Sequence, residues 1–113
     1  MTGASGLTRT LVLEERQRSP DGLGGFTVRW VGVGRLWASI TARTGREAFV
    51  AGRPEARVTY RVLVRGAPVG ARSRPRADQR FREGERVFDI LSVSEADPRG
   101  HYLEVIAEEG RAS

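Results

Sequence analysis

The clearest strand signal in the sequence is EARVTYRVLVR, residues 55–65, in which apolar and polar side chains alternate. One face of this run carries Val58, Tyr60, Val62 and Val64, and the other carries mainly arginine and threonine. Alternation with a period of two indicates a strand that buries one face and exposes the other. At full extension this run would reach about 36 Å. That length exceeds the core of a small domain, so we expect the strand to curve or protrude.

Shorter alternating runs lie on both sides of this strand, at residues 8–16, 26–31, 36–43, 81–85, 87–93 and 101–107. Turn-forming residues separate them, most densely at SPDGLGG (19–25) and DPRG (97–100). The first two runs and the last two runs each predict a hairpin. Gly32 and Gly34 predict a bulge or bend before the third run. We therefore predict an all-β fold, a small antiparallel β-barrel of about six strands with long loops.

The length of 113 residues allows one domain, which we place at residues 8–109. Residues 1–7 are expected to form a flexible N-terminal arm and residues 110–113 a tail. The stretch 46–51 is the only candidate for a short helical turn. No apolar run approaches the roughly 20 residues of a membrane span, and the start does not resemble a secretory signal. Cysteine is absent, and a core this small without disulfides is marginally stable alone, which favours an oligomer.

Charge is distributed unevenly along the chain. All 19 basic residues are arginine, against 14 acidic residues, which gives a net charge of +5. An arginine-only composition is typical of a GC-rich genome, and it also suits pairing with phosphate or carboxylate groups. Residues 1–52 carry a net +3, residues 53–86 a net +6 and residues 87–113 a net −4. This separation suits head-to-tail contacts between copies, or a face turned toward a polyanion.

The basic middle of the chain includes a long segment without apolar periodicity, GAPVGARSRPRAD at 66–78, which we predict to be a loop. Five arginines in and just after it are candidates for sequence-independent contact with phosphates: Arg72, Arg74, Arg76, Arg80 and Arg82. Phe81 is the only aromatic residue among them, so a base-stacking platform for single strands is not expected. A solvated loop and a loop that docks on an acidic protein remain the alternatives to DNA contact.

Motifs for catalysis and cofactor binding are weak. The glycine clusters at 22–25 and 32–34 precede no predicted helix, so turns and bulges explain them better than phosphate cradles. His101 is the only histidine, and no strained turn presents a serine nucleophile to it. Asp89 lies between apolar neighbours, and if buried it needs a partner, for which one of the many arginines is a candidate; a structural role is favoured over an acid–base role. We expect no enzyme activity, no metal site and no cofactor; a hydrolase that uses His101 is the least favoured hypothesis.

Taken in order, these features resemble the phage head–tail joining family, the head-closure (stopper) and head–tail adaptor proteins of long-tailed phages and gene transfer agents. The resemblance runs from about Leu7 to Glu109. Its most telling stretches are WAS (37–39) followed by GRE (45–47), and RVFDI (86–90). The chain departs from the family where members often have proline, at 41–42, and where many have a cysteine, near 107–108. The loop at 66–78 is also longer and more basic than usual.

The resemblance implies a non-enzymatic β-barrel subunit that forms a homo-oligomeric ring in the neck of a phage-like particle. The portal or adaptor protein would lie above the ring and a tail-terminator or tail protein below it, without a membrane. Such a ring retains packaged double-stranded DNA. Its subunits would be made in the host cytoplasm before they enter the particle. By position, residues 66–78 would be the loop that projects into the channel. The alternative hypothesis is a stand-alone nucleic-acid-binding β-barrel that uses the arginine-rich loop.

Overall fold

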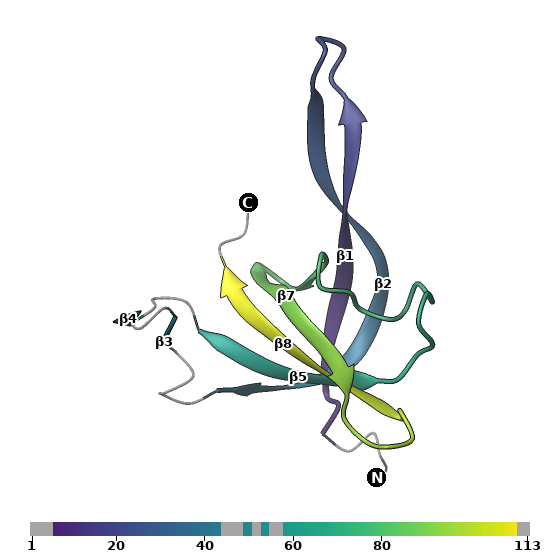
Figure 1. Ribbon diagram of the computed structural model, residues 1–113, viewed down its shortest axis with the longest axis vertical. Coiled ribbons are helices and arrows are strands. Elements are labelled where there is room, and N and C mark those ends of the chain that lie inside the picture. Colours follow the sequence, from purple (N-terminus) through teal and green to yellow (C-terminus); the bar gives the residue numbers. More distant parts are fainter. Residues whose placement is uncertain (1–5, 44–48, 51–52, 55–57, 111–113) are drawn as a thin grey trace.

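Six antiparallel strands form one closed barrel in the order β1-β2-β5-β8-β7-β6 (Figure 1). The computed structural model describes residues 6–43, 49–50, 53–54 and 58–110. The barrel strands are β1 (Arg9–Pro20), β2 (Phe26–Ala42), β5 (Thr59–Arg65), β6 (Arg80–Glu83), β7 (Arg86–Glu95) and β8 (Tyr102–Gly110). Two short strands, β3 (Phe49–Val50) and β4 (Arg53–Pro54), pair only with each other. The described ranges contain no helix, and the predicted all-β barrel is confirmed.

The core fills the inside of the barrel with side chains from alternate positions of all six strands. On β5, Val62 and Val64 point inward, as the alternation predicts, while Arg61 and Arg65 are exposed. The buried cluster consists of Leu11, Leu13, Ala38, Val62, Val64, Phe81, Phe88, Ile90, Leu103, Val105 and Ala107. The β1–β6 pairing at residues 12–14 closes the sheet, so no barrel strand has an open edge where these residues lie.

The β1–β2 hairpin extends far beyond the barrel (Figure 1). Strand β1 pairs with β6 only at residues 12–14, and β2 pairs with β5 only at residues 38–42. Residues 15–31, which we call the ribbon, therefore have no sheet neighbour besides each other. The ribbon contributes to a radius of gyration of 15.3 Å, above the roughly 13 Å expected for a compact domain of this length.

The ribbon corrects the sequence-based division of this region. Runs 26–31 and 36–43 were predicted as separate strands, but they form the single 17-residue strand β2. The predicted bulge is present between them, because Gly34 pairs with Leu13 and Gly32 with Glu14, which leaves Val33 as the extra residue. A bulge bends a strand and increases its twist without ending it. The protruding element is thus the β1–β2 hairpin, whereas β5 stays in the barrel wall.

Other predicted boundaries agree with the structure to within a few residues. The turn at 97–100 closes with a hydrogen bond from the Gly100 N–H to the Asp97 carbonyl oxygen at 3.0 Å. The stretch 46–51 was predicted as a helical turn, but its described residues, Phe49 and Val50, form β3. Residues 1–5, 44–48, 51–52, 55–57 and 111–113 lie outside the described part. Most of the predicted arm and tail falls in these ranges. Leu7, at the end of the arm, is buried at 5% exposure.

Candidate functional site

The long loop predicted at residues 66–78 is present and connects β5 to β6 (Figure 1). Backbone hydrogen bonds close its turns. Pro75 is fully buried and Gln79, directly after the loop, is 3% exposed. The Gln79 side-chain oxygen accepts a hydrogen bond from the Arg76 N–H at 2.8 Å. The end of the loop is therefore fixed where β6 begins.

The three arginines within the loop differ in how their guanidinium groups are used. Arg72 is exposed and has no carboxylate partner among the described residues. Arg74 donates a hydrogen bond to a backbone carbonyl of the same loop at 2.9 Å. Arg76, with a side chain 54% exposed, lies 3.3 Å from Asp78 and 3.7 Å from Glu15 at the start of the ribbon. Arg72 and Arg76 are thus the loop arginines that an external phosphate reaches most directly.

Arg80 and Arg82 share one carboxylate, that of Glu14. The β1–β6 register places Glu14 opposite Arg80. The Arg80 Nε–Glu14 Oε1 distance is 2.7 Å, and the Arg82 Nε–Glu14 Oε2 distance is 3.1 Å. The Arg80 side chain is only 4% exposed, and its guanidinium lies 4.2 Å from the centre of the Trp30 ring. Arg80 is therefore enclosed by the protein, unlike the loop arginines.

An open depression of about 570 Å³ lies where the ribbon leaves the barrel. Its lining combines four arginines with one carboxylate and one indole: Glu14, Arg16, Val28, Arg29, Trp30, Arg80 and Arg82. This excess of guanidinium groups suits a phosphate or carboxylate ligand. The depression was not predicted from the sequence, because the ribbon and β6 are brought together only by the β1–β6 pairing that closes the barrel. The alternation of Phe26, Val28 and Trp30 was the available signal.

The ribbon presents one face of alternating cationic and apolar side chains, which we call the ribbon face: Arg16, Arg18, Phe26, Val28 and Trp30. Cross-strand pairing places Arg16 opposite Trp30 and Arg18 opposite Val28, so these side chains point to one side. The Arg18 guanidinium lies 4.3 Å from the centre of the Phe26 ring, within the range of a cation–π interaction. Phe26 is 57% exposed and Val28 46%. Neither arginine has a carboxylate partner within the described ranges.

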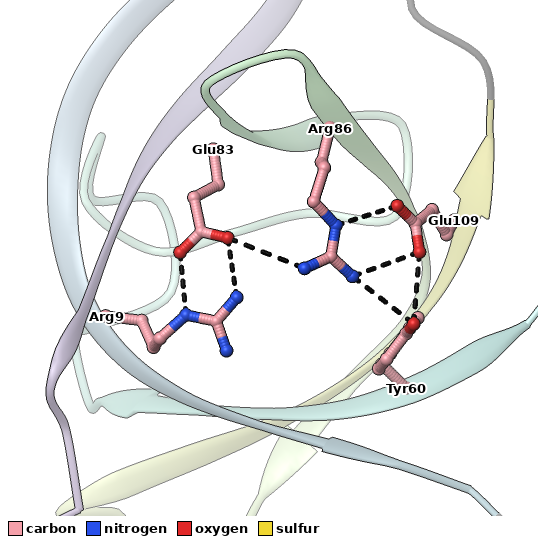
Figure 2. A network of polar contacts seen from close by, with 5 residues as sticks. All are labelled: Arg9, Tyr60, Glu83, Arg86 and Glu109. Atoms are coloured by element: carbon pink, nitrogen blue, oxygen red, sulfur yellow. Dashed lines mark hydrogen bonds and ion pairs between the residues drawn. The ribbon is translucent and has the colours of Figure 1, made fainter.

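A polar network joins strands β1, β5, β6, β7 and β8 through inward-pointing side chains (Figure 2). Arg9 binds both carboxylate oxygens of Glu83, at 2.7 and 2.6 Å. Arg86 Nε lies 2.8 Å from Glu109 Oε2, and the Tyr60 hydroxyl donates a hydrogen bond to Glu109 at 3.0 Å. Arg86 also bridges to Glu83 at 3.8 Å. The network links strands that are far apart in the sequence, and its role is therefore structural.

The ionisation of these groups follows from their partners. The hydrogen bond from Arg9 lowers the pKa of Glu83 below its ordinary value. The hydrogen bond from Arg86 and that from the Tyr60 hydroxyl lower the pKa of Glu109. Burial raises the pKa of Tyr60, and its hydrogen bond to Glu109 raises it further. Both carboxyl groups are therefore held as carboxylates at neutral pH.

The remaining candidate residues occupy separate places. His101 is exposed, and its Nδ1 lies 3.7 Å from Asp97; no described serine contacts it. Asp89 is half-buried and lies opposite Arg80 in the β6–β7 register, but it forms no ion pair with the described residues. The glycines at 22–25 form the tip of the ribbon, where Gly22 and Gly24 have positive φ. No cluster of three or more potential metal ligands occurs among the described residues.

Comparison with known proteins identifies the class to which this barrel belongs. The profile of the phage head completion protein family matches residues 3–110. A chain in the structure of the virion of a native gene transfer agent particle is 47% identical, with a TM-score of 0.75. That match covers 94% of this chain and 96% of the other. Protein SF1141 from Shigella flexneri 2a is 21% identical, with a TM-score of 0.68 over 96% of this chain and 97% of its own, and shares the fold. No curated protein matches the chain.

The chain belongs to the phage head completion protein family, because the match spans nearly its whole length. The resemblance to head–tail joining proteins is thereby confirmed. The family is one of structural components of phage particles rather than of enzymes, and the predicted localisation in a phage-like particle is confirmed. Within the described residues, no helix has the length and apolarity to cross a membrane.

Proposed function

We propose that this chain is a head-closure protein that forms a ring in the neck of a phage-like particle, below the portal or adaptor protein. The ring retains packaged double-stranded DNA and attaches the tail. The observation that carries this proposal is the similarity to a chain of a gene transfer agent virion, at 47% identity over 94% of this chain. Identity at that level over a whole domain supports the same place in a related particle.

Charge supports the DNA-retaining part of the proposal. The proposed candidates for phosphate contact are Arg72, Arg74, Arg76, Arg80 and Arg82, and exposure favours some of them over others. Arg72 and Arg76 are exposed on the loop, whereas Arg80 is enclosed beneath Trp30. A ring multiplies each exposed guanidinium by the number of subunits, which gives a circle of phosphate contacts without base specificity.

We also propose that the chain acts without catalysis and without a cofactor. The polar network of Figure 2 pairs its charges with each other and faces the inside of the barrel. His101 lies on an exposed turn beside Asp97. These groups stabilise the fold, so the function resides in the surfaces that contact the neighbouring proteins and DNA.

The test replaces exposed loop arginines and measures DNA retention by assembled particles. Arg72→Ser combined with Arg76→Ser is preferable to deletion of residues 70–77, because that deletion would remove the buried Pro75. The matched control is Arg35→Ser combined with Arg99→Ser, which removes two exposed arginines elsewhere. We expect filled heads of the loop variant to lose DNA while the control retains it.

Three outcomes would contradict the proposal. If the loop variant retains DNA as well as the control does, the loop does not hold the duplex. If electron microscopy of purified particles finds the chain outside the neck, or absent, the head-closure assignment fails. Tight, salt-dependent DNA binding by a free monomer that never enters particles would instead support the stand-alone nucleic-acid-binding barrel.

A further inference from the structure

The ribbon is built as a contact surface without a partner in the isolated chain. Three of its large apolar side chains are exposed, with Leu23 at 90%, Phe26 at 57% and Val28 at 46%. Arg16 and Arg18 lie on the same face and have no carboxylate partner within the described ranges. Aromatic residues and arginine are enriched in protein interfaces, where the apolar part is covered and the guanidinium finds a carboxylate.

A surface with the complementary character lies on the outside of β7 and β8. Positions that alternate with the buried residues of these strands carry three carboxylates and two apolar side chains: Asp89, Leu91, Glu104, Ile106 and Glu108. We call these residues the β7–β8 outer face. Leu91 is 50% exposed. Arg61 of β5 pairs with Glu104 at 3.0 Å, but Asp89 has no cationic partner in the described part.

The two surfaces are different patches on the outside of the molecule. Asp89 of β7 lies opposite Arg80 of β6 in the register, and Arg80 lies beneath Trp30 at the base of the ribbon. In the closed order β1-β2-β5-β8-β7-β6, strand β8 is three strands from β1 in either direction. The ribbon continues from β1 and extends about 20 Å beyond the barrel, at about 3.3 Å per residue. A contact between two different patches is head-to-tail, and such contacts generate rings when the rotation closes.

We propose that the ribbon face of one copy packs against the β7–β8 outer face of the next copy, so that each subunit clasps its neighbour. Phe26 and Val28 cover Leu91 and Ile106, while Arg18 meets the carboxylates around Asp89. This inference rests on the proposed ring and adds the surfaces that join its subunits. It also explains the net −4 of residues 87–113 against the net +3 of residues 1–52.

Duplex DNA is the other occupant to consider, because a two-stranded ribbon fits a major groove. The exposed apolar side chains favour a protein partner, since phosphate contacts leave Leu23, Phe26 and Val28 in water. The β7–β8 outer face likewise offers exposed apolar area beside its carboxylates.

The absence of cysteine from the sequence makes thiol cross-linking a clean test. The variant carries Val28→Cys on the ribbon and Leu91→Cys on the β7–β8 outer face. Assembled particles are treated with a short bis-maleimide and analysed on a denaturing gel. The controls are each single variant, and Val69→Cys combined with Leu91→Cys, because Val69 is 84% exposed on the loop. The same particles are imaged to establish whether a ring is present in the neck.

We expect the Val28→Cys/Leu91→Cys chain to give a ladder that extends to the full ring, while the three controls stay monomeric. A ring in the neck without this ladder overturns the clasp but leaves the head-closure function intact. A dimer from Val28→Cys alone shows ribbon against ribbon and also overturns it. Absence of any ring overturns the proposed function itself.

A charge variant separates subunit contact from DNA contact. Arg16→Ser combined with Arg18→Ser should raise the protein concentration needed for ring assembly at least tenfold. It should also make assembly more sensitive to salt. Unchanged assembly of this variant, together with a loss of DNA binding, would assign the ribbon to the duplex and contradict the clasp.

Discussion

The barrel and the ribbon use the same residue types in opposite ways. In the barrel and its loop, Arg9, Arg61, Arg76, Arg80, Arg82 and Arg86 each pair with a carboxylate. In the ribbon, Arg16 and Arg18 pair with none and lie over aromatic rings. Phenylalanine shows the same division among the described residues, since Phe81 and Phe88 of the barrel are fully buried while Phe26 of the ribbon is 57% exposed. Most arginines of the barrel thus find their carboxylates within the chain, whereas the ribbon leaves Arg16 and Arg18 available to another molecule.

This difference shows where selection for folding ends and selection for assembly begins. A monomeric domain buries its large apolar groups and pairs its buried charges. Over the part of the chain that the structure describes, the barrel buries its core and pairs its buried charges, apart from the half-buried Asp89. It still exposes Trp37 (59%) and Leu91 (50%) on its outside. The ribbon satisfies neither, although it is as regular a β-structure as the barrel. Measurements that treat the two regions alike should therefore give opposite results.

The largest expected difference concerns the aromatic residues. Phe88→Ala removes a fully buried ring that packs edge-on against Tyr60 at 5.4 Å. We expect it to lower the free energy of unfolding by about 3–5 kcal/mol. Phe26→Ala on the ribbon should change it by less than about 1 kcal/mol, because it removes only an exposed ring and its cation–π contact with Arg18. Urea unfolding of the isolated chain measures both, and a comparable loss from Phe26→Ala would make the ribbon part of the folding unit.

The second difference concerns two adjacent acids at the boundary between the regions. Glu14→Gln leaves the enclosed Arg80 without a counter-charge, so we expect a loss of about 3 kcal/mol. Glu15→Gln is the matched control, because Glu15 only reaches Arg76 at 3.7 Å and is partly exposed. It should cost less than about 1 kcal/mol. Equal effects of the two substitutions in urea unfolding would show that the boundary lies elsewhere.

A smaller effect is expected from acid. Because the pKa values of Glu83 and Glu109 are lowered in the folded chain, their contribution is fully present above the ordinary value of 4.5. It is lost as the pH falls through the lowered folded values. Glu109→Gln should flatten this dependence, by about 1 kcal/mol or less for partly exposed pairs. Thermal unfolding between pH 7 and pH 3 measures it, and an unchanged slope would contradict the assignment.

The smallest effect on folding should come from the ribbon arginines. Arg18→Ser leaves the cation–π contact with Phe26 unmade at an exposed site, worth about 0.5–1 kcal/mol at most. The same substitution should strongly reduce ring assembly, which native mass spectrometry measures. Large destabilisation with normal assembly would reverse the comparison.

Sequence alternation predicted most of the fold, because each barrel strand exposes one face and buries the other over a few neighbouring residues. Val62 and Val64 were placed correctly in this way, as was the bulge at Gly32 and Gly34. The ribbon was not predicted, since a bulge and a strand end produce the same local glycine signal. Length alone suggested that residues 55–65 would curve or protrude, but the sheet pairing that keeps β5 in the wall is non-local.

The arginine-rich loop was located correctly, but the environments of its arginines could not be read from their spacing. Arg80 and Arg82 alternate with Phe81 and look equivalent to Arg72 in the sequence. Only the β1–β6 register brings them to Glu14, 66 and 68 residues away. The stacking of Arg80 on Trp30 depends in turn on the bend of β2. Contacts of this kind follow from closure of the barrel, which no local pattern encodes.

Electron cryo-microscopy of the neck of the native particle, at side-chain resolution, tests the central claim most directly. We predict a closed ring of this chain in which each ribbon lies across β7 and β8 of the neighbouring copy, with Phe26 and Val28 covered. A ring whose ribbons point into solvent, or a neck that lacks the chain, would contradict the account.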